Sequence, residues 1–210
     1  MSPDSPRPLL GRLAVVTGAS DGIGTVIATR LAGLGAEVLL PVRSSEKGRR
    51  ALDVVRREVP DAVASTRVLD LSSLDSVDAL VREIRAEGRP LHLLVNNAGV
   101  MTPPSRQETA DGFELQWGTN HVGHAALTFG LLPLLRAGGA RVVHQTSIAA
   151  RRGRFDETVV AAQPYDAMAS YVQSKIAIGL FARELQERSR AEGWGLTSTL
   201  AHPGVSPTNL

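Results

Sequence analysis

The stretch RLAVVTGASDGIGTVIATRLAGL, residues 12–34, decides the fold. Its apolar start, residues 12–18, ends in glycine, and a helical pattern follows from Ile23 to about Leu34. A short apolar strand that runs into a helix is the first half of a β–α unit. Glycines in such a turn let the chain reverse sharply, approach a phosphate closely and pack the helix against the strand. The helix N-terminus then offers free N–H groups to the phosphate, so the stretch predicts a phosphate-binding turn.

The same alternation of strand and helix continues along the chain. Apolar runs predict five more strands, and helical patterns separate them, including residues 45–58 and 71–88. These strands are expected at residues 36–42, 63–69, 91–97, 140–147 and 195–201. Short Val- and Leu-rich strands that alternate with helices form parallel sheets buried on both faces. The predicted fold class is α/β: one doubly wound, Rossmann-type parallel sheet with helices on both faces. Residues 1–210 form one domain, with a disordered tail expected over residues 1–10.

Composition excludes several classes of function. The 210 residues carry 23 Lys+Arg against 21 Asp+Glu, and only 4% are aromatic. Interspersed charges and few aromatics argue against nucleic acid as a partner. The chain has no Cys, which excludes disulfides and thiolate metal sites. The start MSPDSPRPLL lacks a signal-peptide pattern, and no apolar run reaches the roughly 20 residues that span a bilayer. We therefore expect a cytoplasmic protein without a membrane span.

A second group of residues suggests acid–base chemistry. Tyr171 and Lys175 are four apart in a helical stretch, so they share one face. An ammonium near a phenol favours the phenolate, which suits Tyr171 to proton transfer with a carbonyl or an alcohol. Ser147 is at the C-terminal end of the fifth predicted strand, and ligands of open α/β sheets bind at such strand ends. Thr146, the neighbouring residue, is the rival hydroxyl.

The order of these motifs resembles the short-chain dehydrogenase/reductase family, in particular its retinol-dehydrogenase-like and WW-domain-oxidoreductase-like branch. The matching residues are the TGASDGIG turn, the NNAG of 96–99, NHVGH at 120–124, Ser147, Tyr171-x-x-x-Lys175 and Pro203-Gly204. The resemblance implies an NAD(P)-dependent enzyme that interconverts alcohols and carbonyl groups.

The resemblance also implies roles for single residues. Tyr171 would be the general acid/base, Lys175 would hold the nicotinamide ribose, and Ser147, which the family pattern favours over Thr146, would orient the substrate oxygen. Asn120 would hold a water in a proton relay, although it also fits a helix-kinking or capping amide. Cofactor contacts are expected from Tyr171, Lys175 and the residues Gly18, Ser20, Asp21, Gly22, Ile23, Gly24, Arg43, Asp70, Leu71, Asn97, Ala98, Gly99, Pro203 and Gly204.

Some of these positions have a second interpretation. Asp70 would contact the adenine, yet an Asp at a strand end is also a common helix N-cap. Asn96 would line the adenine-ribose side together with the NNAG backbone, although Asn and Gly also favour turns. His121 and His124 are three apart on a helix, but without a neighbouring acidic residue or Cys we expect packing and no metal.

The residues after the second predicted strand favour NADP(H) over NAD(H). NAD enzymes commonly place an acidic residue there to bind the ribose hydroxyls, whereas this strand runs into Arg43, with Lys47 nearby. A guanidinium fork is suited to a phosphate, and a solvated arginine is the alternative.

The chain departs from the family pattern soon after Pro203-Gly204, where relatives continue with helices that cover the substrate. The C-terminal part of the usual fold is therefore expected to be absent, and a homo-oligomer could complete the site. The segment between Arg151 and Met168 carries Phe155, Val159, Val160 and Tyr165, which favours a small, lipophilic substrate. The alternative function is a non-catalytic dinucleotide-binding regulator or scaffold.

Overall fold

The computed structural model describes residues 6–204 of the chain. Its strands are β1 (Leu13–Val16), β2 (Glu37–Val42), β3 (Ala64–Val68), β4 (Leu93–Asn96), β5 (Arg141–Gln145) and β6 (Thr197–Ala201). The longer helices are α1 (Gly22–Gly33), α2 (Ser45–Glu58), α3 (Leu74–Glu87), α5 (Gly123–Gly130), α6 (Leu132–Ala137) and α8 (Ala167–Ala191). Short helical segments are α4 (Leu115–Trp117), the π-helix η1 (Gly118–Val122), the 3₁₀ helix η2 (Ile148–Arg152) and α7 (Thr158–Ala161).

The six strands form one parallel sheet in the order β3-β2-β1-β4-β5-β6. From β1 the chain first adds β2 and β3 on one side and then β4, β5 and β6 on the other. The position between β1 and β4 is therefore the topological switch point, where doubly wound sheets bind ligands. The expected fold class is confirmed, and each predicted strand range contains one strand. Among residues 6–204, no helix has both the length and the hydropathy that a membrane span requires.

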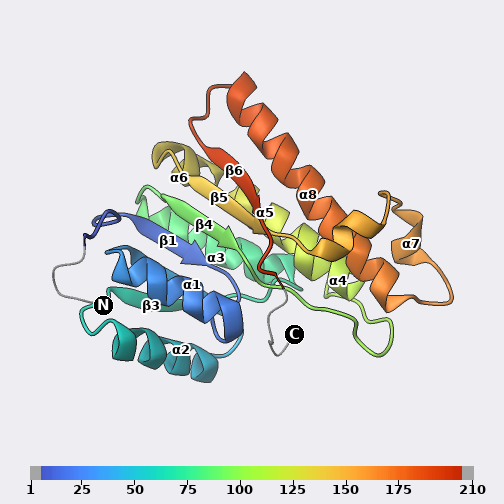
Figure 1. The fold of residues 1–210 in the computed structure, drawn as a ribbon, viewed down its shortest axis with the longest axis horizontal. Coiled ribbons are helices and arrows are strands. Elements are labelled where there is room, and N and C mark those ends of the chain that lie inside the picture. The colour runs from blue at the N-terminus through green and yellow to red at the C-terminus, as the bar shows by residue number, and fades with distance from the viewer. Residues whose placement is uncertain (1–5, 205–210) are drawn as a thin grey trace.

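Two hydrophobic layers cover the two faces of the sheet, because successive side chains of a strand point to opposite faces. Leu13 and Val15 of β1 pack with the side chains of α3, α5 and α6, whereas Ala14 and Val16 pack with those of α1 and α2. Figure 1 shows α1 and α3 on opposite sides of the sheet. The sheet is buried on both sides, which explains the nearly continuous apolar runs in the sequence.

The chain between residues 115 and 137 is not one helix. It is divided into α4, η1, α5 and α6, and the π-helix carries Asn120. Residues 7–10, where a tail was expected, contact the folded chain: the Leu9 amide donates to the Leu34 carbonyl at 3.0 Å, and Leu9 packs against the α1 layer. Residues 1–5 lie outside the described residues.

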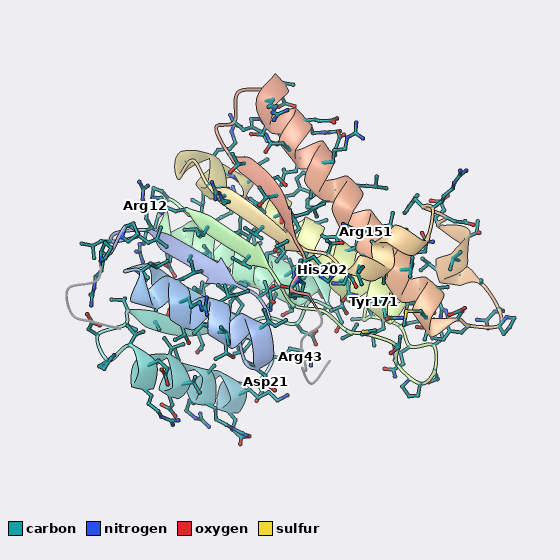
Figure 2. All side chains as sticks on the ribbon, in the orientation of Figure 1. Arg12, Asp21, Arg43, Arg151, Tyr171 and His202 are labelled. Atoms are coloured by element: carbon teal, nitrogen blue, oxygen red, sulfur yellow. The ribbon has the colours of Figure 1, made fainter. Side chains whose placement is uncertain are left out.

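The carboxyl ends of the strands meet at one edge of the sheet. Figure 2 shows Asp21, Arg43, Tyr171 and His202 toward this edge, whereas Arg12 precedes β1 at the opposite one. Most of the predicted cofactor residues follow a strand or begin a helix at this edge, whereas Asn120 lies within η1 and Tyr171 and Lys175 lie within α8.

Three histidines are enclosed by the fold: His124 and His144 are buried, and His121 is half-buried. Burial lowers the pKa of His121 and His124 to about 4 and that of His144 to about 3, from an ordinary value of 6.5. The rings are therefore neutral in the folded protein at neutral pH.

We predict that the free energy of unfolding falls as the pH is lowered from about 6.5 toward 4. In this window the unfolded chain binds protons on these histidines and the native state does not, which removes about 1.4 kcal/mol per pH unit for each residue. The substitution His144→Asn should flatten the slope by about that amount, since Asn does not titrate. Urea unfolding between pH 5 and 7 measures it, and an unchanged slope would contradict the buried, neutral state of His144.

Candidate functional site

A cavity of about 440 Å³ lies at the carboxyl ends of β1 to β4, beside the turn between β1 and α1. Its walls come from the ends of β2 and β5 and from the segments that follow β1 to β4. They are Gly18, Ser20, Asp21, Gly22, Ile23, Gly24, Pro41, Val42, Arg43, Lys47, Leu69, Asp70, Leu71, Ser72, Asn97, Ala98, Gly99, Val100, Leu115, Thr119 and Gln145. The cavity can hold an extended ligand that runs along this edge of the sheet.

Close backbone packing shapes the turn between β1 and α1. Gly18 has φ 65°, which favours glycine. A Cβ on Gly24 would lie 2.2 Å from the Gly18 carbonyl oxygen and 2.7 Å from Asn97 Nδ2. Asn97 Nδ2 in turn donates to the Thr17 carbonyl at 2.9 Å, which ties the end of β4 to the turn. The backbone conformation therefore favours glycine at position 18, and the lack of space for a Cβ requires it at position 24.

The N-terminus of α1 faces this cavity. The Asp21 side chain caps the helix by accepting from the Gly22 amide at 2.7 Å. The first-turn N–H groups of a helix have no intrahelical partners, and the positive end of the helix dipole favours anions. This geometry is suited to a pyrophosphate group.

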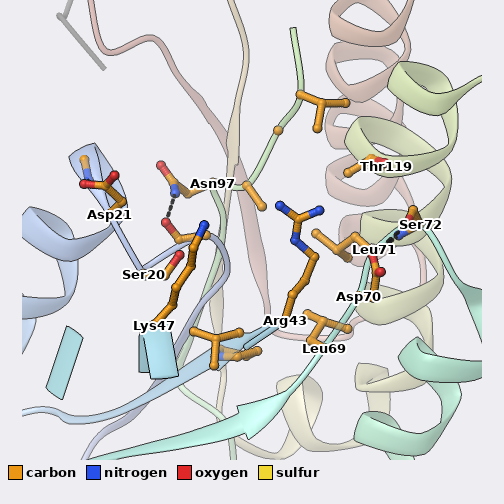
Figure 3. Close-up of a pocket in the computed structure, with 18 of the residues that line it drawn as sticks. Ser20, Asp21, Arg43, Lys47, Leu69, Asp70, Leu71, Ser72, Asn97 and Thr119 are labelled. Atoms are coloured by element: carbon orange, nitrogen blue, oxygen red, sulfur yellow. Dashed lines mark hydrogen bonds between the residues drawn. The ribbon is translucent and has the colours of Figure 1, made fainter. Parts of the chain in front are cut away.

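Two cations extend into the cavity from the β2–α2 connection. Arg43 directly follows β2 and Lys47 lies in the first turn of α2, and Figure 3 shows both side chains among the cavity residues. Within residues 6–204, the ion pairs all involve other cations, so neither Arg43 nor Lys47 is paired with a carboxylate there. Lys47, which the sequence placed only near the site, thus joins Arg43 as a candidate phosphate contact.

Asp70 and Leu71 line the cavity after β3, but Asp70 does not cap α3. Asp70 Oδ1 accepts from the Ser72 amide at 2.9 Å and from the Ser72 hydroxyl at 2.6 Å, which forms a local turn. The cap is Ser73, whose hydroxyl accepts from Ser76. The capping alternative for Asp70 is therefore wrong, because the strand-to-helix connection is three residues longer than that interpretation needs.

The residues of the NNAG segment face two different regions, the cavity and the core. Asn97, Ala98 and Gly99 line the cavity, whereas Asn96 is only 2% exposed and donates to Thr128 Oγ1 and His144 Nδ1 in the core. Because strand side chains alternate between faces, adjacent asparagines point apart. The expectation that Asn96 lines the adenine-ribose side is wrong.

Tyr171 and Lys175 lie on the buried face of α8, 7% and 5% exposed. Lys175 Nζ is 5.6 Å from the centroid of the Tyr171 ring and donates to the Gln145 carbonyl at 3.2 Å. Burial lowers the pKa of Lys175 to about 8, so the ammonium remains the dominant form at neutral pH. Since Gln145 lines the cavity, the ammonium lies just behind the cavity wall.

Asn120 connects the same region to the strand ends. Its Oδ1 accepts from the Val100 amide at 2.8 Å, and its Nδ2 donates to the Val100 carbonyl at 2.9 Å and to Ser174 Oγ at 3.0 Å. A Cβ on Gly99 would lie 3.2 Å from Asn120 Oδ1 and 3.4 Å from Lys175 Nζ. The structure thus brings Gly99, Asn120 and Lys175 together, and Asn120 lies in a π-helix, a form frequent at functional sites.

The two candidate hydroxyls after β5 have different partners. Thr146 Oγ1 donates to the Lys175 carbonyl at 3.2 Å, whereas Ser147 Oγ caps η2 by accepting from the Ala149 amide at 3.2 Å. The Thr146 proton is therefore occupied by α8, and the Ser147 proton has no such acceptor within residues 6–204.

Not every predicted residue lines the cavity. Tyr171, Lys175, Pro203 and Gly204 lie outside its walls, and Pro203 and Gly204 are exposed after β6. Three polar lining residues were missed by sequence reasoning. Ser72 and Thr119 adjoin the predicted Leu71 and Asn120, and Gln145 ends β5, two residues before Ser147. Among the described residues, no three His, Cys, Asp or Glu side chains cluster as a metal site.

The segment between η2 and α8 is held by polar side chains. Gln116 Nε2 donates to the Tyr165 hydroxyl at 2.9 Å, and that hydroxyl donates to Glu114 Oε1 at 2.8 Å. On the other side, Gln173 accepts from the Asp156 amide and donates to the Arg154 carbonyl. These bonds fix the segment against α4 and α8, beside Tyr171.

We predict that Gly24→Ala weakens the binding of a nicotinamide dinucleotide at least tenfold and lowers the free energy of unfolding, because the new Cβ overlaps the Gly18 carbonyl. Gly179→Ala in α8 is the control, since its Cβ would meet only Leu200 Cδ1 at 3.9 Å. It should stabilise the helix by about 0.5–1 kcal/mol and leave binding unchanged. Fluorescence titration and urea unfolding check both, and equal behaviour of the two variants would refute the close-packing argument.

Comparison with known proteins places this geometry in a family. The short chain dehydrogenase profile matches residues 12–210. The chain is 44% identical over 211 residues to polyprenol dehydrogenase of Mus musculus, covering 98% of this chain and 62% of that protein. It is 40% identical to retinol dehydrogenase 13 of Homo sapiens, covering 95% of this chain and 60% of that protein. The chain thus spans about three fifths of the length of these curated relatives.

A solved structure supports the same assignment. A metagenomic short-chain oxidoreductase in complex with NADP superposes with a TM-score of 0.75 at 28% identity, covering 94% of this chain and 84% of that one. Together with the family match over residues 12–210, this shows that the chain belongs to the short-chain dehydrogenase family, in its retinol-dehydrogenase-like branch.

Proposed function

We propose that this chain forms the dinucleotide-binding and acid–base part of an NADP(H)-dependent oxidoreductase that interconverts an alcohol and a carbonyl group on a small, lipophilic substrate. The observation that carries the proposal is the buried Lys175 ammonium, which lies beside the Tyr171 ring and behind the wall of the cavity at the strand ends. An ammonium buried next to a phenol has a clear chemical use in proton transfer.

The cavity supports the dinucleotide part of the proposal. The turn between β1 and α1 would hold the pyrophosphate on backbone N–H groups, and Arg43 and Lys47 would contact the 2′-phosphate of NADP(H). Asp70 and Leu71 would contact the adenine, and Asn97, Ala98 and Gly99 would line the adjacent ribose. Pro203 and Gly204 are proposed to contact the nicotinamide carboxamide.

The residues beside the cavity support the chemical step. A reduced nicotinamide would supply the hydride. The Tyr171 hydroxyl would give its proton to the carbonyl oxygen, and the Lys175 ammonium would stabilise the phenolate that remains. Ser147 would hold the substrate oxygen through its free proton. Asn120 would order a water molecule next to Lys175, from which Tyr171 regains its proton.

A lipophilic substrate fits the surface around Tyr171. Trp117 and Phe155 face each other at 6.0 Å between ring centroids, and Phe155 is 45% exposed. Exposed aromatic surface favours apolar ligands. The names of the relatives, polyprenol dehydrogenase and retinol dehydrogenase 13, refer to isoprenoid alcohols, so an isoprenoid aldehyde is the first substrate to test.

We predict that Tyr171→Phe lowers turnover of such an aldehyde by a factor of about 10² to 10⁴, since general acid–base catalysis contributes about that much. The affinity for NADPH should stay within about twofold, because the ring and Lys175 remain. Stopped-flow oxidation of NADPH measures the first quantity, and Trp117 and Trp194 fluorescence the second. Turnover near the wild-type rate would remove Tyr171 from the mechanism.

We predict that Arg43→Asp weakens NADPH binding about 10- to 100-fold, since a charge-assisted hydrogen bond contributes about 1.5–3 kcal/mol. NADH binding should stay the same or strengthen, because the new carboxylate can accept from the ribose hydroxyls. Arg49→Asp is the matched control: it changes the net charge of the chain equally, but Arg49 lies in α2 and does not line the cavity. An unchanged NADPH/NADH ratio in Arg43→Asp would exclude a contact with the 2′-phosphate.

Titration with NADPH, combined with the turnover assay, distinguishes an enzyme from a non-catalytic binding protein. Binding of NADPH by the wild-type chain without turnover of any aldehyde favours a regulator or scaffold, and turnover that depends on Tyr171 excludes it.

A further inference from the structure

His124 is a fully buried side chain that joins the glycine turn to the π-helix. It lies in the first turn of α5 and is 1% exposed. Its Nδ1 is 2.9 Å from the Asn120 carbonyl oxygen, and its Nε2 is 2.9 Å from Thr17 Oγ1 at the end of β1. One imidazole ring therefore touches both the residue that begins the cofactor turn and the residue next to Lys175.

The protonation of this ring follows from its partners. Burial holds the pKa of His124 at about 4: the bond to the Asn120 carbonyl offsets this effect only in part, and the neighbouring Lys175 ammonium adds to it. The ring is therefore neutral at pH 7. A carbonyl oxygen only accepts hydrogen bonds, so the proton is on Nδ1, and Nε2 accepts from the Thr17 hydroxyl.

Thr17 extends the chain of bonds to the cavity wall. Its Oγ1 accepts from the amides of Asn97 and Ala98, each at 3.0 Å. Two acceptors lie within reach of the Thr17 proton, His124 Nε2 at 2.9 Å and the Val95 carbonyl oxygen at 3.3 Å, and His124 is the nearer. With its proton on His124, the hydroxyl uses its donor and both acceptor positions. The bonds then run in one direction, from the cavity wall through Thr17 and His124 to the Asn120 carbonyl.

The far end of this chain reaches α8. The Asn120 side chain holds Val100 and Ser174, and the Ser174 hydroxyl donates to the Tyr171 carbonyl at 2.8 Å. Ser174 is also the neighbour of Lys175. A change in the position of Asn120 would therefore move its amide relative to both proposed proton-transfer residues.

We propose that His124 is a positioning residue: its Nδ1–H bond to the Asn120 carbonyl sets the π-helix in register with the cofactor turn. This inference rests on the proposed function of Asn120 and Tyr171. The bond to Asn120 governs the chemical step, and the bond to Thr17 governs the cavity wall. The two halves of the ring therefore have separable effects.

Two substitutions separate them. In His124→Asn, the Nδ2 group can take the place of Nδ1–H and donate to the Asn120 carbonyl, while the contact with Thr17 is lost. In His124→Gln, the Oε1 atom can take the place of Nε2 and accept from Thr17, while the donor to Asn120 is lost. We expect single-turnover hydride transfer to stay within about threefold of wild type in His124→Asn and to fall about 10- to 100-fold in His124→Gln. NADPH affinity should show the opposite order, with the larger loss in His124→Asn.

Hydrogen exchange tests the bond between His124 and the Asn120 carbonyl without cofactor or substrate. The Val100 amide donates to Asn120 Oδ1, so its hydrogen exchange reports whether Asn120 keeps its place. Exchange should speed up in His124→Gln and not in His124→Asn. In the wild-type chain, ¹⁵N NMR of the imidazole should show the neutral tautomer with the proton on Nδ1 at pH 7.

His144 supplies the matched control. It is equally buried, its ring is also neutral, and its Nδ1 partner is Asn96, not Asn120. His144→Asn and His144→Gln should lower the free energy of unfolding and leave Val100 exchange and hydride transfer unchanged. The proposal is overturned by the Nε2–H tautomer, by a charged His124 ring, or by equal effects of the two His124 variants. If the wild-type chain neither binds NADPH nor turns over an aldehyde, the proposed function fails, while the tautomer and the exchange data still decide the role of His124.

Discussion

The arrangement of the site depends on one close approach, between the turn after β1 and the end of β4. The Gly18 carbonyl lies so near the Gly24 Cα that no side chain fits between them, and Asn97 bonds to the Thr17 carbonyl across the same gap. This approach brings the N-terminus of α1 to the cavity and fixes the strand end that carries Gly99. Gly99 lies beside Asn120 and Lys175. The contact between the turn after β1 and the end of β4 therefore also sets where the strand end meets these two residues.

The parallel sheet accounts for how readily the fold was predicted. Strands buried on both faces are nearly continuous apolar runs, so all six were visible in the sequence. Many of the cofactor residues can be predicted for a related reason, because they follow strands and one edge of the sheet collects such positions. Arg43, Asp70 and Asn97 each follow a strand, and all three line the cavity at that edge.

Three features were beyond the sequence, for different physical reasons. Asn120, in the π-helix, bonds to Val100 and to His124, and His124 in turn contacts Thr17, which is 107 residues away. Local propensity contains no signal for such contacts. Asn96 and Asn97 are neighbours whose side chains point to opposite faces. Which of the two faces the cavity depends on where the strand ends, and the sequence does not define that residue. Ser73 and Asp70 are both good helix caps, and only the length of the connection chooses between them.

The two sides of the site are built from different materials. On the cofactor side, the turn between β1 and α1 packs so closely that the Gly24 position has no room for a methyl group. The segment over Tyr171 is attached by Glu114, Gln116, Tyr165 and Gln173, whose hydrogen bonds tolerate exchange for other polar pairs. None of these bonds involves Gly18, Gly24 or Asn97, so a substitution in this segment would leave the close packing of the glycine turn in place.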